Sequence, residues 1–371
     1  MSPIAIAAGG TGGHLFPAEA LAAELTARGE RIVLFTDARS AAFDSPAFSN
    51  AERFVLSGEG IAGRSPVKAA KGAMKLAAGT MTARGLLKRL NAAAVVGFGG
   101  YPAIPPALAA LSLGRGRPAL ILHEQNAVLG RANRALAPRA DLLALAYAET
   151  SRVPPSAHVA HVGNPVRPAL AALAGAEYPS ADGALRLLVT GGSLGARVFA
   201  DLVPPAIAAL PEAIRTRLVI DQQCRVEDLE RVRAAYAGTG IPVQLSPFFP
   251  DIAGRLASAH LVIARAGAST VAELACAGRP SLLLPLPSAI DNHQAANARA
   301  LEAAGAALVL PQATTTPARL AELLEQFLGS SERLAEAAHA AASLARPQAA
   351  RDLADLVLAL AHRAQTLQEP R

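Results

Sequence analysis

The sequence predicts an α/β protein of two similar halves, each a parallel sheet wound with helices. Short apolar runs alternate with segments of helical periodicity along the whole chain. A glycine-rich turn also occurs twice, at residues 8–14 (AGGTGGH) and 190–196 (TGGSLGA). Each turn follows an apolar run and opens a helical segment, which is the local design that holds phosphate on a helix N-terminus. The duplication predicts a two-domain enzyme with its ligand between the halves.

The apolar runs locate the expected strands. In the first half they lie at residues 4–8, 31–36, 53–56, 93–97, 119–122, 142–145 and 158–162. In the second half they lie at residues 185–190, 217–220, 243–246, 261–264, 281–284 and 307–310. Residues 163–168 are expected to cross between domains, 171–184 to form a loop, and the chain to be helical from Pro317 onward. The predicted domains are 1–163 and 164–345, with 346–371 a C-terminal helix that packs back on the first domain.

Composition excludes several classes of protein. The 371 residues are 52% hydrophobic but only 4% aromatic, so the apolar excess is alanine-rich helix. The longest charge-free stretch, residues 90–114, is broken by glycines and prolines and does not predict a membrane span. No basic segment precedes an apolar core at the N-terminus, and two cysteines make no disulfide framework. We therefore expect a cytosolic protein.

Positive charge is concentrated in the first half. Residues 1–163 hold 17 Lys and Arg against 10 Asp and Glu, and the remainder holds 18 against 19. The basic residues gather in one window with apolar residues between them: Arg64, Lys68, Lys71, Lys75, Arg84, Lys88 and Arg89. Such a surface suits an anionic membrane, although a solvated helix with its apolar side in the core has the same pattern. The window has no interleaved aromatic residues, so nucleic acid is not an expected partner.

The first glycine-rich turn has two interpretations. It could belong to a dinucleotide fingerprint, with Asp37 holding a ribose, but Leu15 stands where the third glycine would be. His14 lies at the mouth of the same helix, where a neutral imidazole is poised as a base because the helix dipole disfavours its charged form. The alternative is a helix-capping or structural histidine.

Other polar clusters follow predicted strands. They are residues 97–102 (GFGGYP), 123–126 (HEQN), 265–270 (RAGAST) and 291–297 (DNHQAAN). Buried strands seldom end in such clusters by accident, since each polar group needs a partner. Glu273 follows Thr270 at the spacing of a capping box and could instead hold a ribose diol. No histidine and cysteine cluster has metal-ligand spacing, so no metal or cofactor is expected.

Taken together and in order, these motifs resemble the MurG family of bacterial transferases. The shared motifs are GGTGGH, GFGGY, HEQN, GNPVR, GGSxGA, RxGAxTxxE and DxHQxxNA. The resemblance implies a GT-B fold of two Rossmann-like domains facing a cleft. It also implies inverting, metal-independent transfer of N-acetylglucosamine from UDP-GlcNAc to the C4 hydroxyl of undecaprenyl-pyrophosphoryl-MurNAc-pentapeptide (lipid I to lipid II). The implied location is the cytoplasmic face of the inner membrane, as a peripheral protein.

The resemblance also implies roles for individual residues. His14 is the first candidate for the base, Arg167 and Ser193 meet the diphosphate, and Glu273 holds the ribose. The residues expected to contact UDP-GlcNAc are Thr11, Gly12, Gly13, Asn126, Arg167, Ser193, Phe249, Arg265, Ala268, Thr270, Glu273, His293 and Gln294. Those expected to contact the acceptor are Gly10, His14, Gly99, Gly100 and Tyr101.

Two positions depart from the family pattern. Leu194 stands where the family usually has glutamine, and residues 221–224 (DQQC) replace a His-Gln-Ser/Thr-Gly turn, so no role is assigned there. Two other functions stay open on the residues alone. One is a related GT-B enzyme that moves a hexose from a UDP-sugar to another lipid. The other is a nicotinamide-dependent oxidoreductase, against which the missing third glycine argues.

Overall fold

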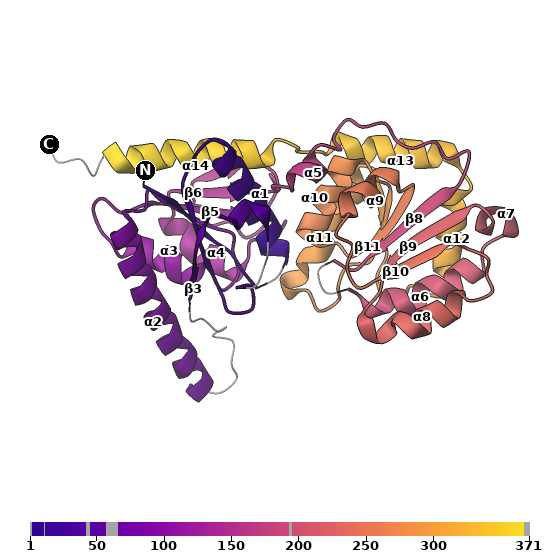
Figure 1. Ribbon diagram of the computed structural model, residues 1–371, viewed down its shortest axis with the longest axis horizontal. Coiled ribbons are helices and arrows are strands. Elements are labelled where there is room, and N and C mark those ends of the chain that lie inside the picture. The colour runs from indigo at the N-terminus through magenta and orange to yellow at the C-terminus, as the bar shows by residue number, and fades with distance from the viewer. Residues whose placement is uncertain (1, 11, 42–44, 57–65, 193–194, 367–371) are drawn as a thin grey trace. The chain divides into compact units, whose positions relative to one another are not determined.

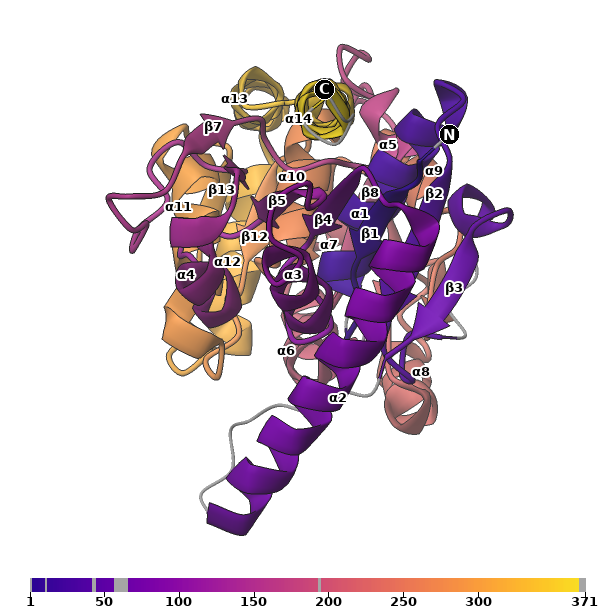
Figure 2. The same cartoon turned by 90° about the vertical axis from the view of Figure 1, so that its left-hand side faces the viewer.

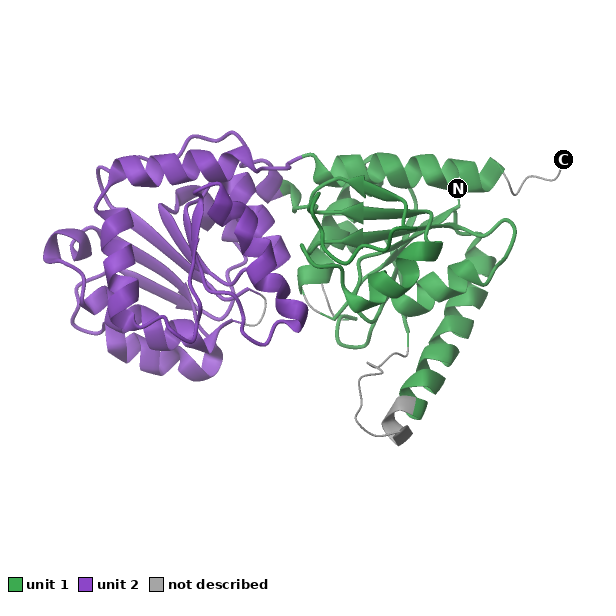
Figure 3. Cartoon of the chain, turned by 180° about the vertical axis from the view of Figure 1, so that it is seen from behind, with its two compact units in different colours: residues 1–168, 348–371 green, residues 169–347 purple. Residues whose placement is uncertain are grey.

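The chain folds into two units, the first of which takes in the C-terminal helix. The computed structural model describes all residues except 1, 11, 42–44, 57–65, 193–194 and 367–371, and leaves the side chains of 66–69 undescribed. Residues 1–168 and 348–371 form the first unit, and residues 169–347 form the second (Figure 3).

A parallel sheet forms the centre of the first unit, with strand order β3-β2-β1-β4-β5-β6-β7. The strands are β1 (Ile4–Ala7), β2 (Ile32–Thr36), β3 (Glu52–Val55), β4 (Ala94–Gly97), β5 (Ala119–Glu124), β6 (Leu142–Leu145) and β7 (Val159–His161). Residues of β1 alternate between two buried clusters, Ile4 and Ile6 in one, Ala5 and Ala7 in the other. Burial on both faces explains why the inner strands β1, β2, β4 and β5 are almost wholly apolar, whereas the edge strands β3 and β7 are partly exposed.

Helices cover both faces of the first sheet (Figure 1). They are α1 (Gly12–Ala27), α2 (Pro66–Leu90), α3 (Ile104–Leu111), α4 (Arg131–Leu136) and α14 (Ala349–Thr366), with short 3-10 turns η1 (Pro46–Phe48) and η2 (Ala137–Arg139). Helices α1 and α14 pack on the face of Ile4 and Ile6, and α2, α3 and α4 pack on the other.

The last helix, α14, is part of the first core. Leu353 and Val357 are fully buried against the first sheet, and α14 lies beside α1. The guanidinium of Arg28, which directly follows α1, lies 2.5 Å from the Asp355 carboxylate. Since the burial of one leucine-sized side chain contributes about 1.5–3 kcal/mol, the apolar contacts outweigh this exposed ion pair in holding α14.

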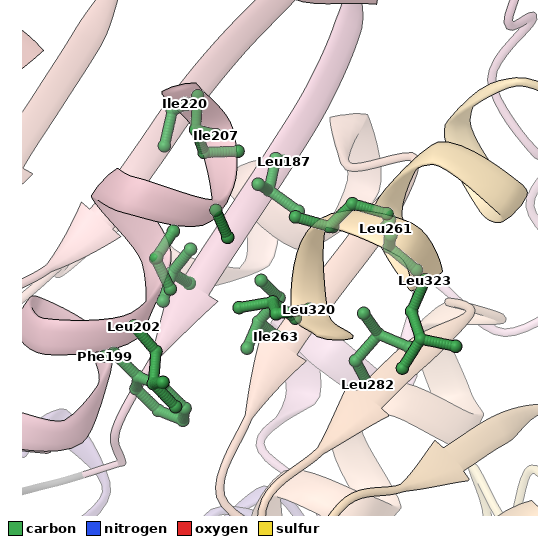
Figure 4. Close-up of a cluster of buried hydrophobic side chains, with 14 of the residues drawn as sticks. Leu187, Phe199, Leu202, Ile207, Ile220, Leu261, Ile263, Leu282, Leu320 and Leu323 are labelled. Carbon is green, nitrogen blue, oxygen red and sulfur yellow. The ribbon is translucent and has the colours of Figure 1, made fainter. Parts of the chain in front are cut away.

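The second unit repeats the plan, with strand order β10-β9-β8-β11-β12-β13 and all pairs parallel. Its strands are β8 (Leu185–Thr190), β9 (Leu218–Gln223), β10 (Val243–Ser246), β11 (Leu261–Ala264), β12 (Ser281–Leu283) and β13 (Ala307–Val309). Its helices and 3-10 turns, starting at the unit boundary, are α5 (Pro168–Ala171), α6 (Arg197–Ala208), α7 (Glu212–Arg215), η3 (Val226–Asp228), α8 (Leu229–Tyr236), α9 (Ile252–Ser258), α10 (Ala268–Ala277), η4 (Ile290–Asn292), α11 (His293–Ala303), α12 (Pro317–Leu328) and α13 (Ser331–Ser343). Leu187 and Ile263 on the sheet meet Phe199 of α6 and Leu320 of α12 in one buried cluster (Figure 4).

The prediction of two doubly wound parallel sheets is confirmed, and each expected strand is present. Two strands run further than their apolar residues indicate. Strand β5 continues through His123 and Glu124, and β9 continues to Gln223. In both places polar side chains belong to the strand itself, at its carboxyl end.

Candidate active site

Both sheets reverse their strand order beside their first strand, which is where open α/β sheets bind ligands. In the first sheet this point lies between the carboxyl ends of β1 and β4, and in the second between those of β8 and β11. The two glycine-rich turns follow β1 and β8, residues 98–102 follow β4, and residues 265–267 follow β11. The motifs of each unit therefore converge on one edge of its sheet.

In the first unit, His14 occupies the first turn of α1 and is tied to the loop after β4. Its Nδ1 lies 2.7 Å from the carbonyl oxygen of Phe98. A carbonyl only accepts, so Nδ1 must carry the proton and donate it. The lone pair of the neutral ring is then on Nε2.

The amide of Gln125 also contacts the His14 ring, 2.5 Å from Nδ1. The amide nitrogen is the atom placed nearest Nδ1. Because an N–H cannot donate to a ring nitrogen that itself carries a proton, we assign the two ends of the amide the other way round, with the oxygen sharing the Nδ1 proton with Phe98. Gln125 is buried at the carboxyl end of β5. The histidine tautomer is thus held from two strands, β4 and β5.

The turn after β4 needs glycine for two reasons. Gly99 and Gly100 have φ of +75° and +65°, in the left-handed region. A Cβ on Gly100 would also lie 3.1 Å from Nε2 of His14. The backbone turn therefore passes close to the ring nitrogen that carries the lone pair. The Tyr101 hydroxyl, next in the chain, is buried with no hydrogen-bond partner among the described residues.

The first glycine-rich turn packs on the end of β2. A Cβ on Gly9 would approach the side chains of Thr36 and Pro102 to 3.0 Å, and the Gly10 N–H donates to the Ser40 hydroxyl at 2.8 Å.

Burial alone would raise the pKa of Asp37, but hydrogen bonds from Ser40 and Arg39 hold it below its usual value. Asp37 therefore supports this turn from within the protein, and the ribose role considered for it has no support. Gly12 and Gly13 begin α1, and Thr11 lies outside the described residues.

Glu124 organises the loop that carries Asn126. Its carboxylate accepts four hydrogen bonds of 2.9–3.0 Å, from the backbone and side chain of Asn126, from the Gly130 N–H and from Asn133. Charge-assisted bonds of this kind fix backbone and side chain together. Glu124 is therefore the support that presents Asn126.

His123 is fully buried under the same edge of the sheet. Burial lowers the pKa of its imidazole to about 4, although a hydrogen bond from Nε2 to the Gly163 carbonyl at 3.1 Å opposes the shift. The ring is neutral at physiological pH and packs beside Phe98. It ties the end of β5 to the segment that leaves the first unit.

Arg167 belongs to the first unit, although its motif was expected to open the second domain. Its guanidinium lies 4.4 Å from the ring centroid of Phe16, which is on α1 two residues after His14. Its cationic group is therefore held beside the first turn of α1 by an aromatic face.

In the second unit, the turn after β8 is built from glycines and fastened by one amide. A Cβ on Gly191 would lie 2.3 Å from the Ala196 nitrogen, so only glycine fits there. Gln223, at the end of β9, bonds Thr190, Gly191, Gly192 and Pro247. Ser193 and Leu194 lie outside the described residues. Helix α6 begins immediately after the turn, with Ala196 as its N-cap.

Arg265 fastens the loop after β11. Its guanidinium donates to the carbonyls of Leu284 and Pro285. It also donates to the side-chain oxygen of Gln312, at 2.7 Å. Burial lowers the pKa of Arg265, with Arg225 nearby adding to the effect. Arg265 is thus directed mainly into the protein.

Helix α10 begins at Ala268 with Gly267 as its N-cap. Thr270 therefore lies within the first turn, so the capping box proposed for Thr270 and Glu273 is wrong. Glu273 is 9% exposed on the second turn of α10. The capping box therefore does not explain this carboxylate, and its ribose role remains a prediction.

The segment after β10 carries two adjacent aromatic residues, of which Phe249 is the expected donor contact. Phe249 is only 5% exposed and lies under the Arg255 guanidinium, 4.1 Å from the ring centroid, whereas Phe248 is 53% exposed. Arg255 is itself anchored by Asp221 at 2.5 Å. A planar ligand at this edge would meet the ring of Phe248 and the backbone of Phe249.

Two residues at the start of α11 point back to the preceding loop. The His293 Nδ1–H donates to the Ile290 carbonyl at 2.8 Å, and the Gln294 amide oxygen accepts from the Leu286 N–H at 2.9 Å. Asp291 and Asn292 both have φ near +54°, an unusual conformation for residues with side chains. Strained backbone of this kind concentrates at ligand sites.

Helix α2 carries the basic window. Figure 2 shows its N-terminal half extending away from the sheet. Ala83 and Leu87 are buried, while Met74 and Met81, two turns apart, are 68% and 74% exposed. Lys71, Lys88 and Arg89 are exposed, and Arg84 donates to Ser112 at the end of α3. Arg64 and the side chain of Lys68 lie outside the described residues. No helix in the described ranges has the length and hydropathy to cross a membrane.

Two glutamines at strand ends have contacts that the sequence did not predict: Gln125 was expected only as part of the polar cluster 123–126, and Gln223 was given no role. Gln125 contacts His14, and Gln223 fastens the turn after β8. The available signal was a buried amide at the carboxyl end of a strand, adjacent to a ligand-binding edge.

Across the described residues, no group of three histidine, cysteine or acidic side chains has the arrangement of a metal site.

Comparison with known proteins supplies the family. Residues 4–144 match the glycosyltransferase family 28 N-terminal domain, and residues 186–356 match the family's C-terminal domain. A protein of Granulibacter bethesdensis named UDP-N-acetylglucosamine–N-acetylmuramyl-(pentapeptide) pyrophosphoryl-undecaprenol N-acetylglucosamine transferase is 56% identical over 96% of this chain and 93% of its own length. A protein of the same name from Acidiphilium cryptum is 54% identical over 96% of both chains.

Solved structures agree. The crystal structure of Acinetobacter baumannii MurG matches with a TM-score of 0.77 and 32% identity, over 97% of this chain and all of that one. The calicheamicin glycosyltransferase CalG4 matches with a TM-score of 0.64 at 18% identity over 98% of this chain and 99% of its own, a likeness of fold alone.

Proposed function

The chain belongs to glycosyltransferase family 28, and we propose that it transfers N-acetylglucosamine from UDP-GlcNAc to undecaprenyl-pyrophosphoryl-MurNAc-pentapeptide, converting lipid I to lipid II. It is a UDP-GlcNAc-dependent glycosyltransferase of peptidoglycan synthesis with the GT-B fold. Identity above 50% to named transferases across nearly the whole chain is the observation that carries this conclusion. The oxidoreductase interpretation falls with the family.

The first unit binds the acceptor and supplies the base. The C4 hydroxyl oxygen of the muramoyl sugar attacks the anomeric carbon of UDP-GlcNAc, the bond from that carbon to the diphosphate oxygen breaks, and UDP leaves with the electron pair. The hydroxyl proton passes to Nε2 of His14, since Nδ1 is already protonated and bonded to Phe98. Gly10, Gly99, Gly100 and Tyr101 border the acceptor, and the buried Tyr101 hydroxyl is suited to one of its oxygens.

The second unit binds most of the donor. Backbone N–H groups of the turn after β8 and the N-terminus of α6 face the diphosphate, together with Ser193 and Arg167. Glu273 holds the ribose hydroxyls, and the backbone of Phe249 borders the uracil. The remaining donor contacts proposed are Thr11, Gly12, Gly13, Asn126, Arg265, Ala268, Thr270, His293 and Gln294.

The acceptor's lipid requires a membrane-facing surface on the same protein, and α2 supplies it. Met74 and Met81 insert among the lipid head groups, and the lysines and arginines of α2 bind anionic lipid. The proposed location is accordingly the cytoplasmic face of the inner membrane, as a peripheral protein. Nucleic acid is not part of the proposal.

The decisive experiment is transfer of labelled N-acetylglucosamine from UDP-GlcNAc to a lipid I analogue in the presence of EDTA. Labelled lipid II in the β configuration is the expected product. Donor binding without transfer would indicate a different lipid acceptor, as in a related hexosyltransferase. Transfer that EDTA abolishes and added metal restores would overturn the metal independence that the resemblance to the family implies.

A further inference from the structure

Gln223 lies where the second sheet meets the donor site, in the segment that departs from the family pattern. It is the last residue of β9, and its side chain is only 4% exposed. Its neighbour Gln222 is also buried but points to the other side of the sheet, where it bonds the Phe199 carbonyl and the Tyr236 hydroxyl. Two adjacent buried glutamines thus serve different parts of the unit.

The amide of Gln223 makes every hydrogen bond available to it. Its oxygen accepts from the Thr190 hydroxyl at 3.0 Å and from the Gly191 N–H at 2.9 Å. Its nitrogen donates to the carbonyls of Gly192 at 2.8 Å and Pro247 at 3.0 Å. The Gly191 N–H only donates and the two carbonyls only accept, so these partners fix the orientation of the amide.

These four bonds join two segments that come from different strands. Three of them fasten the turn after β8, and the fourth fastens the segment after β10, which contains Phe248 and Phe249. Gly191 packs so closely under Gly195 and Ala196 that a shift of the turn would move the residues that begin α6. The position of the diphosphate-binding backbone therefore depends on one side chain.

We infer that Gln223 is a positioning residue for the sugar nucleotide, which sets the affinity for its diphosphate by holding the turn after β8 against the segment after β10. The inference rests on the proposed function, because it takes that turn as the diphosphate site. Gln223 touches no reacting atom. Its removal is expected to weaken donor binding and to leave acceptor binding and the base unaffected.

The test replaces each glutamine by methionine, which keeps the length of the side chain and removes the amide. For Gln223→Met we expect the KM for UDP-GlcNAc to rise at least tenfold, with the acceptor KM within twofold of the parent value. We also expect the Kd for UDP to rise at least tenfold and that for uridine less than threefold, because three of the four bonds hold the diphosphate turn. Gln222→Met is the matched control. It should lower Tm without changing the donor KM.

Gln223→Asn gives a second measurement if the methionine variant is poorly folded. Its amide is one methylene too short to reach both segments, so it should show the same selective loss of UDP over uridine. A donor KM within twofold of the parent, or equal losses for UDP and uridine, would overturn the inference. Failure of the proposed function is distinguishable, since the unsubstituted chain would then not bind UDP-GlcNAc, or would bind it without transfer.

Discussion

Nδ1 of His14 and the carbonyl oxygen of Phe98 lie 2.7 Å apart, although the two residues are 84 positions apart in the sequence. The contact decides the tautomer of the imidazole, because the carbonyl needs a proton donor. It also decides which ring nitrogen can take a proton from a substrate. The first prediction tests that nitrogen.

We expect His14→Ala to lower kcat by about 10²- to 10⁴-fold, the usual contribution of a general base, with the Kd for UDP-GlcNAc within twofold of the parent. Steady-state kinetics and donor titration measure the two quantities. His161→Ala, an exposed histidine of the same unit, is the control and should retain activity. Near-normal turnover by His14→Ala would remove it from the mechanism.

A second prediction concerns the space beside Nε2. In Gly100→Ala the new Cβ would lie 3.1 Å from Nε2, where the acceptor hydroxyl has to approach, so we expect kcat to fall at least tenfold. Gly114→Ala is the matched control, because Gly114 also has positive φ (+73°) but a Cβ added there would meet no atom within 4 Å. Both variants should lose about 1–2 kcal/mol of stability from the left-handed backbone. Equal kcat values for the two would show that the turn does not border the reaction.

The apolar runs in the sequence located β1 to β13. Most of these strands are buried on both faces, whereas the edge strands β3, β7 and β10 are partly exposed and were found from a few apolar residues each. The sequence could not locate the polar ends of the strands, since His123 and Gln223 continue their strands on hydrogen bonds to partners elsewhere. The loops around His14 were found as motifs. The tautomer was not, because Phe98 and Gln125 are 84 and 111 residues away from His14. Long-range pairing of this kind leaves no local pattern.

A third prediction tests the membrane role of α2. Reversing two of its lysines, in Lys71→Glu/Lys75→Glu, should weaken binding to anionic vesicles by about 30-fold or more, since each basic residue near the lipid contributes about 1 kcal/mol. Cosedimentation with vesicles measures it. Arg351→Glu/Arg363→Glu, at two exposed positions on α14, is the control. Its affinity for the vesicles should stay closer to that of the parent. Equal weakening in both variants would indicate general attraction of a basic protein.

A fourth prediction follows from His123. Its pKa is about 4 in the folded protein because of burial and about 6.5 unfolded, so between these values the unfolded chain binds more protons. The stability that the buried, neutral His123 contributes is complete above pH 6.5 and is lost as the pH falls toward 4. At pH 5 it is smaller by about 2 kcal/mol than at pH 8.

Urea unfolding at pH 8 and pH 5 measures this difference. In His123→Gln the loss of stability between the two pH values should be smaller by about 2 kcal/mol than in the parent. His161→Gln, at an exposed position, should keep the full loss. If His123→Gln kept it as well, the acid sensitivity would arise from other groups.

The fifth prediction concerns the two cysteines, one of which follows Gln223 directly. Cys224 and Cys276 are 2% and 3% exposed, and burial raises the pKa of each thiol to about 11. At pH 8 about 0.1% of each would be thiolate, the reactive form. We expect a thiol-exchange reagent to leave the folded protein unmodified over minutes and to label both cysteines in urea. Gln223→Met should speed labelling of Cys224 and leave Cys276 protected, because the end of β9 loses its bonds to the turn. Equal labelling of both thiols in that variant would mean that the whole unit opens, and that Gln223 holds more than the turn after β8.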